Sequence, residues 1–243
     1  MMKNLILTTA ALALSASMAL AQGTTVRMGT EGAYPPYNFI NDAGEVDGFE
    51  RELGDELCKR AELTCTWVTN EWDSIIPNLV SGNYDTIVAG MSITPERAKV
   101  ISFTQDYYPP TESAYVATSP DVDVTTGTVS AQTSTIQAGY VAESGADLLE
   151  FATPDETLAA VRNGEADAVF ADYDYLAPIV EASGGELMFV GEGVPLGGGI
   201  GMGLRQTDTE LRDKFDAAIT AMKQDGTLNT LLVKWFGEGI GQY

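Results

Sequence analysis

Apolar residues recur at helical spacing in two parts of the chain. In residues 49–59, Phe49, Leu53 and Leu57 stand four positions apart, which places their side chains on one face of a helix. A second stripe with the same spacing consists of Leu211, Phe215 and Ile219. Such stripes predict helices that pack against a hydrophobic core.

Capping-box patterns, in which Ser or Thr is followed three residues later by Glu or Gln, predict where further helices begin. Thr153 and Glu156 form one such pair, and Thr207 and Glu210 form another. Apolar segments typical of strands lie between the predicted helices, as at residues 168–171. Strands that alternate with helices in this way indicate an α/β fold.

A short pattern occurs twice, in residues 80–89 and 162–171. In each copy a helix ends at a glycine, an aspartate (Asp85 or Asp167) follows three residues later, and an apolar strand begins. The repeat predicts two lobes with the same helix-to-strand unit, and functional side chains at the carboxyl ends of the strands, where open α/β sheets bind ligands. A chance match of so short a pattern is the alternative.

The start of the chain is typical of a secretory signal. Lys3 supplies the charged start, residues 5–14 the apolar stretch, and residues 19–21 (Ala-Leu-Ala) a cleavage site. We therefore expect a signal peptide at residues 1–21 and a soluble mature protein that is exported. The residue directly after the cleavage site is Gln22 and not a cysteine that could carry a lipid anchor, and no later stretch approaches the roughly 18 apolar residues that a membrane span requires.

The composition excludes several classes of function. Asp and Glu number 35 against 13 Lys and Arg, a formal net charge of −22, which argues against nucleic acid or an anionic membrane as a partner. The chain has no histidine, which excludes Ser–His and Cys–His catalysis and the usual zinc sites. We expect neither a metal nor a cofactor.

Cys58 and Cys65 are the only cysteines, and in an exported chain they predict a disulfide. Closing so short a loop stabilises a fold by about 2–3 kcal/mol in the chain-entropy model. A metal or redox site would require more ligands or a C-x-x-C spacing.

Arg97 lies in the first turn of a predicted helix, with Thr94 as the N-cap and Pro95 as the first helical residue. A cation there typically costs about 0.3–1 kcal/mol, because it meets the positive end of the helix dipole. An anion shared by Arg97 and the free N–H groups would remove this cost, and a guanidinium fork suits a carboxylate. The alternative is that Arg97 leans out to Glu96 or another surface acid.

Several segments match a known set of motifs in the same order: residues 29–39 (GTEGAYPPYNF), 48–50 (GFE), 72–79 (WDSIIPNL), 91–97 (MSITPER), 106–108 (DYY) and 225–228 (DGTL). In these the chain resembles the periplasmic polar-amino-acid-binding proteins of ABC importers, solute-binding protein family 3, which include lysine/arginine/ornithine-, histidine- and glutamine-binding proteins. The resemblance covers most of the mature chain.

The resemblance implies a two-lobed periplasmic binding protein fold of type II, in which two crossing strands join the lobes. The first lobe would comprise residues 22–112 and 201–243, and the second lobe residues 113–200. The crossings fall near residues 110–116 and 198–202. The glycine run at residues 197–199 suits a hinge, although glycines also simply form loops.

The resemblance also implies how the backbone groups of an amino acid would be held. Arg97 would bind the α-carboxylate bidentately, assisted by Ser92. From the second lobe, Thr135 would offer its N–H as the first residue of a helix capped by Ser134 and Gln137, or that cap would serve only its own helix. Asp172, at the end of the strand at residues 168–171, would pair with the α-ammonium, or would simply cap the next helix. Ala89 and Gly90 lack the hydroxyls found at these positions in some relatives and retain only their backbone carbonyls.

Recognition of the ligand side chain would fall to Glu31, Tyr34 and Trp72. Two aromatic rings could sandwich a side chain and would favour a guanidinium, while Glu31 could meet a distal positive charge. These aromatics could instead be ordinary core or cleft residues. The resulting hypothesis is a monomeric binding protein that delivers a cationic amino acid or an opine to a membrane permease. A neutral polar amino acid such as glutamine is the alternative ligand, and a prephenate or arogenate dehydratase that uses Glu31 or Asp172 as its acid is the alternative class.

Overall fold

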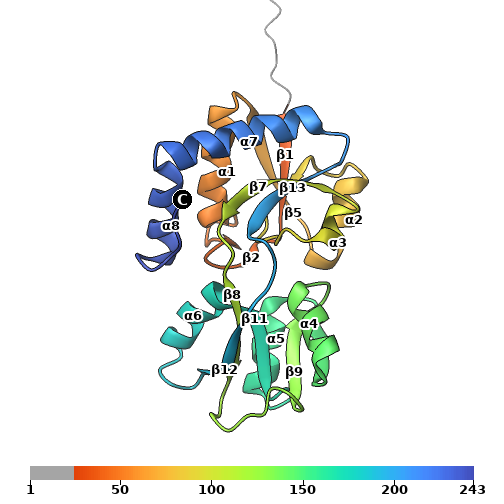
Figure 1. Cartoon of the computed structure of the whole chain (residues 1–243), viewed down its shortest axis with the longest axis vertical. Helices are drawn as coiled ribbons and strands as arrows, with labels where there is room; N and C mark the ends of the chain where they lie inside the picture. Colours follow the sequence, from red (N-terminus) through yellow and green to blue (C-terminus); the bar gives the residue numbers. More distant parts are fainter. Residues whose placement is uncertain (1–24) are drawn as a thin grey trace, which may run out of the picture.

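The structure, a computed structural model, describes residues 25–243, so the predicted signal peptide at residues 1–21 lies outside the described part. The described chain forms two lobes, one above the other in Figure 1, which confirms the predicted α/β class and its division into two lobes. Across residues 25–243 no helix is both long and apolar enough to span a bilayer.

The first lobe is built on a five-stranded sheet in the order β5–β1–β6–β13–β7. Its strands are Thr64–Thr69, Thr25–Thr30, Thr86–Ile87, Ile200–Leu204 and Ser102–Tyr108. Its helices are α1 (Phe49–Arg60), α2 (Ile75–Val80), α3 (Pro95–Ala98), α7 (Thr209–Gln224) and α8 (Thr227–Phe236), with a 3₁₀ turn η1 (Trp72–Ser74). A small sheet of β2 (Ala33–Tyr34), β3 (Asn38–Ile40) and β4 (Val46–Asp47) precedes α1.

The second lobe is built on a sheet in the order β10–β9–β11–β8–β12. Its strands are Asp147–Phe151, Thr128–Gln132, Ala168–Asp172, Glu112–Ala117 and Met188–Pro195. Its helices are α4 (Ile136–Ser144), α5 (Pro154–Arg162) and α6 (Tyr173–Ala182). Figure 1 shows the blue C-terminal helices in the upper lobe beside the orange α1, so both ends of the described chain belong to the first lobe.

Between the two sheets the chain passes twice, through residues 109–111 after β7 and residues 196–199 after β12. Gly197 and Gly199 have positive φ, and a Cβ at Gly197 would lie only 2.9 Å from the Cβ of Ser92. A Cβ at Gly199 would lie 2.8 Å from the carbonyl oxygen of Tyr108. Close packing at the junction therefore requires these glycines. The predicted lobe boundaries at residues 112/113 and 200/201 stay a prediction.

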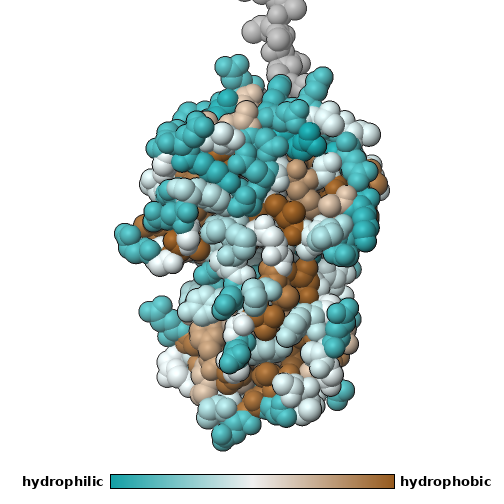
Figure 2. Space-filling model, viewed as in Figure 1, coloured by the Kyte–Doolittle hydropathy of each residue, from teal (hydrophilic) through white to brown (hydrophobic). Residues whose placement is uncertain are grey.

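Hydrophobic packing follows the predicted stripes. Phe49, Leu53 and Leu57 of α1 are fully buried and join Phe215 and Ile219 of α7 in the main core of the first lobe. Figure 2 shows hydrophilic residues over much of the outer surface of this lobe and hydrophobic residues near the middle of the view, where the lobes meet.

The predicted repeat has a structural counterpart in each lobe. Asp85 accepts a hydrogen bond from the backbone N–H of Arg27 at the start of β1 (3.0 Å), and Asp167 accepts one from that of Thr128 at the start of β9 (2.8 Å). In both lobes the strand that follows the aspartate runs parallel to the strand it is tied to. The two aspartates thus align equivalent strands of the two lobes.

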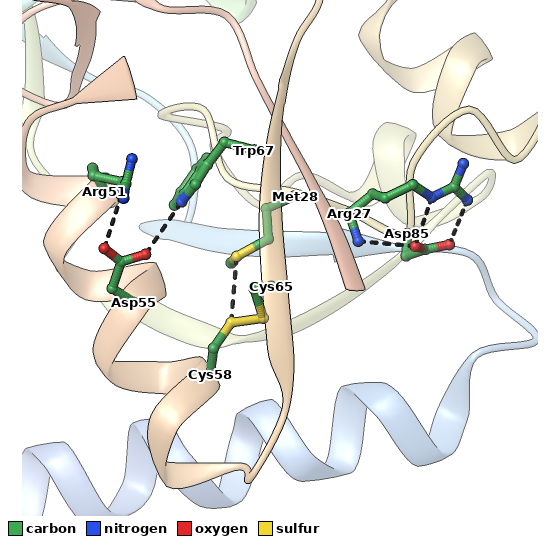
Figure 3. The surroundings of a disulfide bond; sticks show 8 residues. All are labelled: Arg27, Met28, Arg51, Asp55, Cys58, Cys65, Trp67 and Asp85. Carbon is green, nitrogen blue, oxygen red and sulfur yellow. Dashed lines mark hydrogen bonds and ion pairs between the residues drawn. A yellow bond between two sulfur atoms is a disulfide. The ribbon is translucent and has the colours of Figure 1, made fainter. Parts of the chain in front are cut away.

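The Cys58–Cys65 disulfide is present, and it joins the end of α1 to β5 (Figure 3). Its Cys58 sulfur lies 3.5 Å from the sulfur of the buried Met28 on β1. On the exposed side, Asp55 of α1 bridges Arg51 and the indole N–H of Trp67 on β5 (Figure 3). The disulfide ties a helix to its neighbouring strand, and neither of its cysteines lines the cavity formed by the predicted ligand residues.

Candidate ligand-binding site

All predicted ligand residues line one cavity. From the first lobe come Glu31, Tyr34, Trp72, Ala89, Gly90, Ser92 and Arg97. The second lobe supplies the predicted Thr135 and Asp172 together with Gln132, Ile136 and Gln137, which were not predicted as ligand residues. Residues far apart in the sequence therefore meet where the lobes face each other.

Thr94 caps α3 as predicted: its hydroxyl accepts from the backbone N–H of Arg97 at 3.1 Å, and Pro95 is the first helical residue. The Arg97 side chain turns to the cavity and away from Glu96. Its guanidinium donates to the carbonyl oxygen of Ser92 (2.9 Å) and lies over the Trp72 ring at 5.3 Å. The helix α3 has only four residues and therefore no strong dipole. The position of Arg97 is explained by the cavity that its side chain faces.

The electrostatics of Arg97 suit an anion. Burial lowers the pKa of Arg97 to about 10, while the negative charge of Asp172 acts in the opposite direction. The guanidinium stays protonated at neutral pH. A partly desolvated guanidinium with donors free beyond its bond to Ser92 is a strong partner for a carboxylate.

Asp172 ends β11 and occupies the N-cap position of α6, but its side chain makes no capping hydrogen bond. Its carboxylate instead accepts from the hydroxyl of Tyr34 (2.8 Å) and the side-chain amide of Gln137 (3.0 Å). Burial raises the pKa of Asp172 to about 6, and the bond from Tyr34 and the charge of Arg97 partly offset this. Asp172 is therefore mostly ionised at neutral pH and open to stabilisation by a cation.

Glu31 follows β1 and accepts a 2.6 Å hydrogen bond from the side-chain amide of Gln132 in the other lobe. Burial raises the pKa of Glu31 to about 7; the Gln132 bond lowers it and the charge of Glu71 raises it further. The Glu31–Gln132 and Tyr34–Asp172 bonds both connect the lobes, so the structure is closed over the cavity.

Both aromatic residues contact other side chains, and Tyr34 lies beside Tyr37 with ring centroids 5.8 Å apart. Tyr34 stacks on Tyr175 with ring centroids 4.1 Å apart and an interplanar angle of 11°. Trp72 faces the Arg97 guanidinium, and its indole N–H is buried without a hydrogen-bond partner. The sandwich of a ligand side chain between Tyr34 and Trp72 stays a prediction.

The predicted capping box of Ser134 and Gln137 is wrong. Thr135 itself is the N-cap of α4, its hydroxyl accepting from the N–H of Ala138 at 3.1 Å, and Ser134 adopts a left-handed conformation with φ 60°. Gln137 turns to Ser113 and Asp172 instead. Because the helix begins one residue later, the free N–H groups of its first turn belong to Thr135 and its successors.

The capping box expected at Thr207 and Glu210 is also wrong, since α7 begins at Thr209 after Asp208 and has no side-chain cap. The Asp208 carboxylate lies 2.7 Å from the guanidinium of Arg205, and Thr207 donates to Asp208. This ion pair fixes the turn before α7 in place of the expected cap. The capping box of Thr153 and Glu156 is confirmed at α5.

Comparison with known proteins decides the family. The model of bacterial extracellular solute-binding proteins, family 3, matches residues 26–238. The chain belongs to this family. The resemblance inferred from the motifs is thereby confirmed, and with it the two-lobed fold of periplasmic binding proteins.

Relatives of this solute-binding protein are similar along nearly their whole length. The lysine/arginine/ornithine-binding periplasmic protein of Escherichia coli (strain K12) is 31% identical over 241 residues, covering 93% of this chain and 92% of the relative. A periplasmic His/Glu/Gln/Arg/opine family-binding protein from Silicibacter pomeroyi, solved in complex with lysine, is 78% identical, with a TM-score of 0.89 and coverage of 90% of this chain and 100% of that one. An ancestral arginine-binding protein bound to glutamine is 29% identical, with a TM-score of 0.81 and coverage of 88% and 98%.

Gln132 occupies the position in the second lobe that Glu31 occupies in the first. Aligned on the aspartates and their partner strands, Glu31 and Gln132 occupy matching positions after Arg27 and Thr128, and they hydrogen-bond to each other. Gly90 and Asp172 match in the same way, five positions after Asp85 and Asp167. The cavity is thus lined by equivalent positions of the two lobes.

Proposed function

We propose that the protein captures an amino acid with a positively charged side chain in the periplasm and, as a monomer, delivers it to the permease of an ABC importer. One observation carries the proposal: a single cavity holds one guanidinium and two separate carboxylates, contributed by both lobes. This charge pattern is complementary to a zwitterion that bears a further cation. The chain's membership of a solute-binding family favours binding over the dehydratase alternative.

The α-carboxylate of the ligand would lie against Arg97. The guanidinium has donors left after its bond to Ser92, and Thr135 brings the start of α4 to the same cavity. A charged, bidentate contact in a closed cavity is among the stronger hydrogen-bond arrangements. The start of a helix adds free N–H groups that suit the same anion.

The α-ammonium would pair with Asp172, whose two carboxylate oxygens now accept from Tyr34 and Gln137. An ammonium brings three donors and a full charge, so it stabilises the ionised carboxylate more than neutral donors do. Ala89 and Gly90 line the same cavity, and their backbone carbonyls could accept the remaining ammonium protons.

The distal cation of the ligand would meet Glu31, between the aromatic rings of Tyr34 and Trp72. The 78% identical relative in complex with lysine supports this choice. A neutral ligand such as glutamine is the second candidate, supported by the ancestral arginine-binding protein that was solved with glutamine.

Capture would proceed by closure of the lobes. The ligand first binds the contacts of one lobe, the lobes rotate about the two junctions, and contacts from both lobes then favour the closed state. The bonds between Tyr34 and Asp172 and between Glu31 and Gln132 are contacts that closure would form. The closed protein is the form that the permease would recognise.

A ligand screen tests the proposal. Protein unfolded and refolded to remove carried-over ligand is titrated by calorimetry with the common amino acids, ornithine and octopine. We expect lysine, arginine or ornithine to bind most tightly and to raise the unfolding temperature by linkage. Tighter binding of glutamine would establish the neutral alternative, and binding of no amino acid would refute the proposal.

We expect Glu31→Gln to weaken the binding of a cationic ligand by about 1–3 kcal/mol, the range for a hydrogen bond to a charged group. The binding of a neutral ligand should stay nearly unchanged. The pH dependence provides a second measurement. Because the pKa of Glu31 is raised to about 7 and a cation favours its ionised form, lysine affinity should fall as the pH drops below about 7. In the Gln variant this component of the pH dependence should vanish.

Glu71→Gln is the matched control for Glu31, because it removes the same charge beside the site from an exposed residue outside the cavity lining. It should change lysine affinity much less. Equal losses in both variants would mean that Glu31 acts only through the general field of the acidic surface.

A further inference from the structure

Glu50, the second residue of α1, is a fully buried carboxylate outside the cavity lining. It accepts from the backbone N–H of Gly90 (2.7 Å), the side-chain amide of Asn38 (2.7 Å) and the hydroxyl of Tyr107. A buried charge is tolerated only when it is well hydrogen-bonded. Here two of the three donors lead directly to ligand-facing segments of the first lobe.

The first connection fixes the peptide between Ala89 and Gly90. Its N–H points to Glu50, and in a trans peptide the carbonyl points the opposite way. The carbonyl oxygen of Ala89 is therefore turned away from Glu50, and both residues of this peptide bond line the cavity. Gly90 has φ +60°, a conformation that glycine adopts without strain.

The second connection fixes the segment that carries Glu31. The Asn38 side chain donates to Glu50 with its nitrogen and accepts from the backbone N–H of Gly32 with its oxygen, both at 2.7 Å. An amide held at both ends cannot flip without losing both bonds. Glu31 directly precedes Gly32, so this chain of bonds ends beside the carboxylate that lines the cavity.

We propose that Glu50 is a positioning residue of the ligand site, which through Gly90 and Asn38 holds the backbone of both first-lobe segments in the orientation that faces the ligand. The inference rests on the proposed amino-acid-binding function. A carboxylate suits this place because every partner presents a hydrogen to it. A glutamine side chain at position 50 would place its own N–H groups opposite one of these donors, where no hydrogen bond can form.

Three variants separate positioning from simple stabilisation. Glu50→Gln alters the acceptor of both connections. Asn38→Ala removes only the connection to Gly32. Tyr107→Phe removes the third donor and leaves the connections to Gly90 and Gly32 in place. Each is titrated with lysine and glutamine, and its unfolding temperature is measured without ligand. The backbone amide signals of Gly90 and Gly32 are followed by ¹H–¹⁵N NMR.

We expect Glu50→Gln to lower the affinity for lysine and for glutamine by at least about 10-fold. Tyr107→Phe should change either affinity by less than about 2-fold. Both variants should lower the unfolding temperature. Asn38→Ala should lower the affinity for lysine more than the affinity for glutamine, because it releases the segment that bears Glu31. The amide proton of Gly90 should move upfield in Glu50→Gln alone, and that of Gly32 should shift in Asn38→Ala.

Wild-type affinity in Glu50→Gln, or equal losses in Glu50→Gln and Tyr107→Phe, would overturn the inference. If Glu50→Gln does not fold, the contrast between Asn38→Ala and Tyr107→Phe decides the question in the same way. Failure of the proposed function looks different: the wild-type protein itself would bind neither amino acid.

Discussion

Arg97→Ala should abolish amino-acid binding at ordinary ligand concentrations while the fold stays intact. Removing one partner of a desolvated charge pair costs about 2–5 kcal/mol, a loss of roughly 30- to 4,000-fold in affinity. The ligand carboxylate would be left in the closed cavity with only neutral donors beside it. Calorimetric titration with lysine measures the loss, and circular dichroism reports the fold.

Lys99→Ala is the matched control for Arg97, because it removes an exposed positive charge just beyond α3. It should bind lysine as the wild type does. Arg97→Lys should fall between the two, since it keeps the charge but loses the planar fork. Near-wild-type titrations with Arg97→Ala would place the carboxylate site elsewhere.

Asp172→Asn should weaken binding almost as much, by about 2–5 kcal/mol, because a neutral amide of the same shape replaces the partner of the α-ammonium. The effect should extend to cationic and neutral amino acids alike, since all share the α-ammonium. This distinguishes Asp172 from Glu31, whose replacement should affect cationic ligands selectively. Competition between labelled lysine and glutamine in each variant measures the difference.

Asp167→Asn provides the control for Asp172 within the same strand region. Asp167 stands just before β11 and bonds the N–H of Thr128, so its replacement removes the same charge and perturbs the same sheet. We expect a lower unfolding temperature with nearly unchanged affinity. Similar affinity losses in both variants would show that the second lobe had merely been disrupted.

Local chemistry was sufficient to predict much of the fold. Four-residue spacing identified the buried face of α1, and the repeated glycine and aspartate located equivalent strands in both lobes. These signals are readable because they depend on neighbours within one helix or one turn. The motif around Arg97 was readable for the same reason, since its cap and its proline are adjacent in sequence.

Features that depend on competition between neighbours were not predictable. Ser134 and Thr135 are adjacent hydroxyl residues, and only the turn after β9 decides that Thr135 is the cap. At α7 the ion pair of Asp208 with Arg205 prevailed over the expected cap at Thr207. In both places the sequence contains two acceptable partners within one turn.

Gln132 and Gln137 were missed because amides carry no strong chemical signal of their own. Their roles follow from what they meet: Gln132 bonds Glu31 across the lobes, and Gln137 bonds Asp172. Glu50 belonged to a recognised motif, yet its connections to Gly90 and Asn38 join three separate segments of the chain. Such networks become visible only in three dimensions.

The position of β13 determines which sheet can be completed first as the exported chain emerges from its N-terminal end. This strand lies between β6 and β7 in the first sheet but belongs to residues 200–204, after the whole second lobe. The second sheet is contiguous in sequence and can form as soon as β12 has emerged. The first sheet lacks its strand between β6 and β7 until roughly the last fifth of the chain has emerged, because β6 and β7 cannot pair with β13 before that. A cavity shared by both lobes is therefore among the last features of this protein to form.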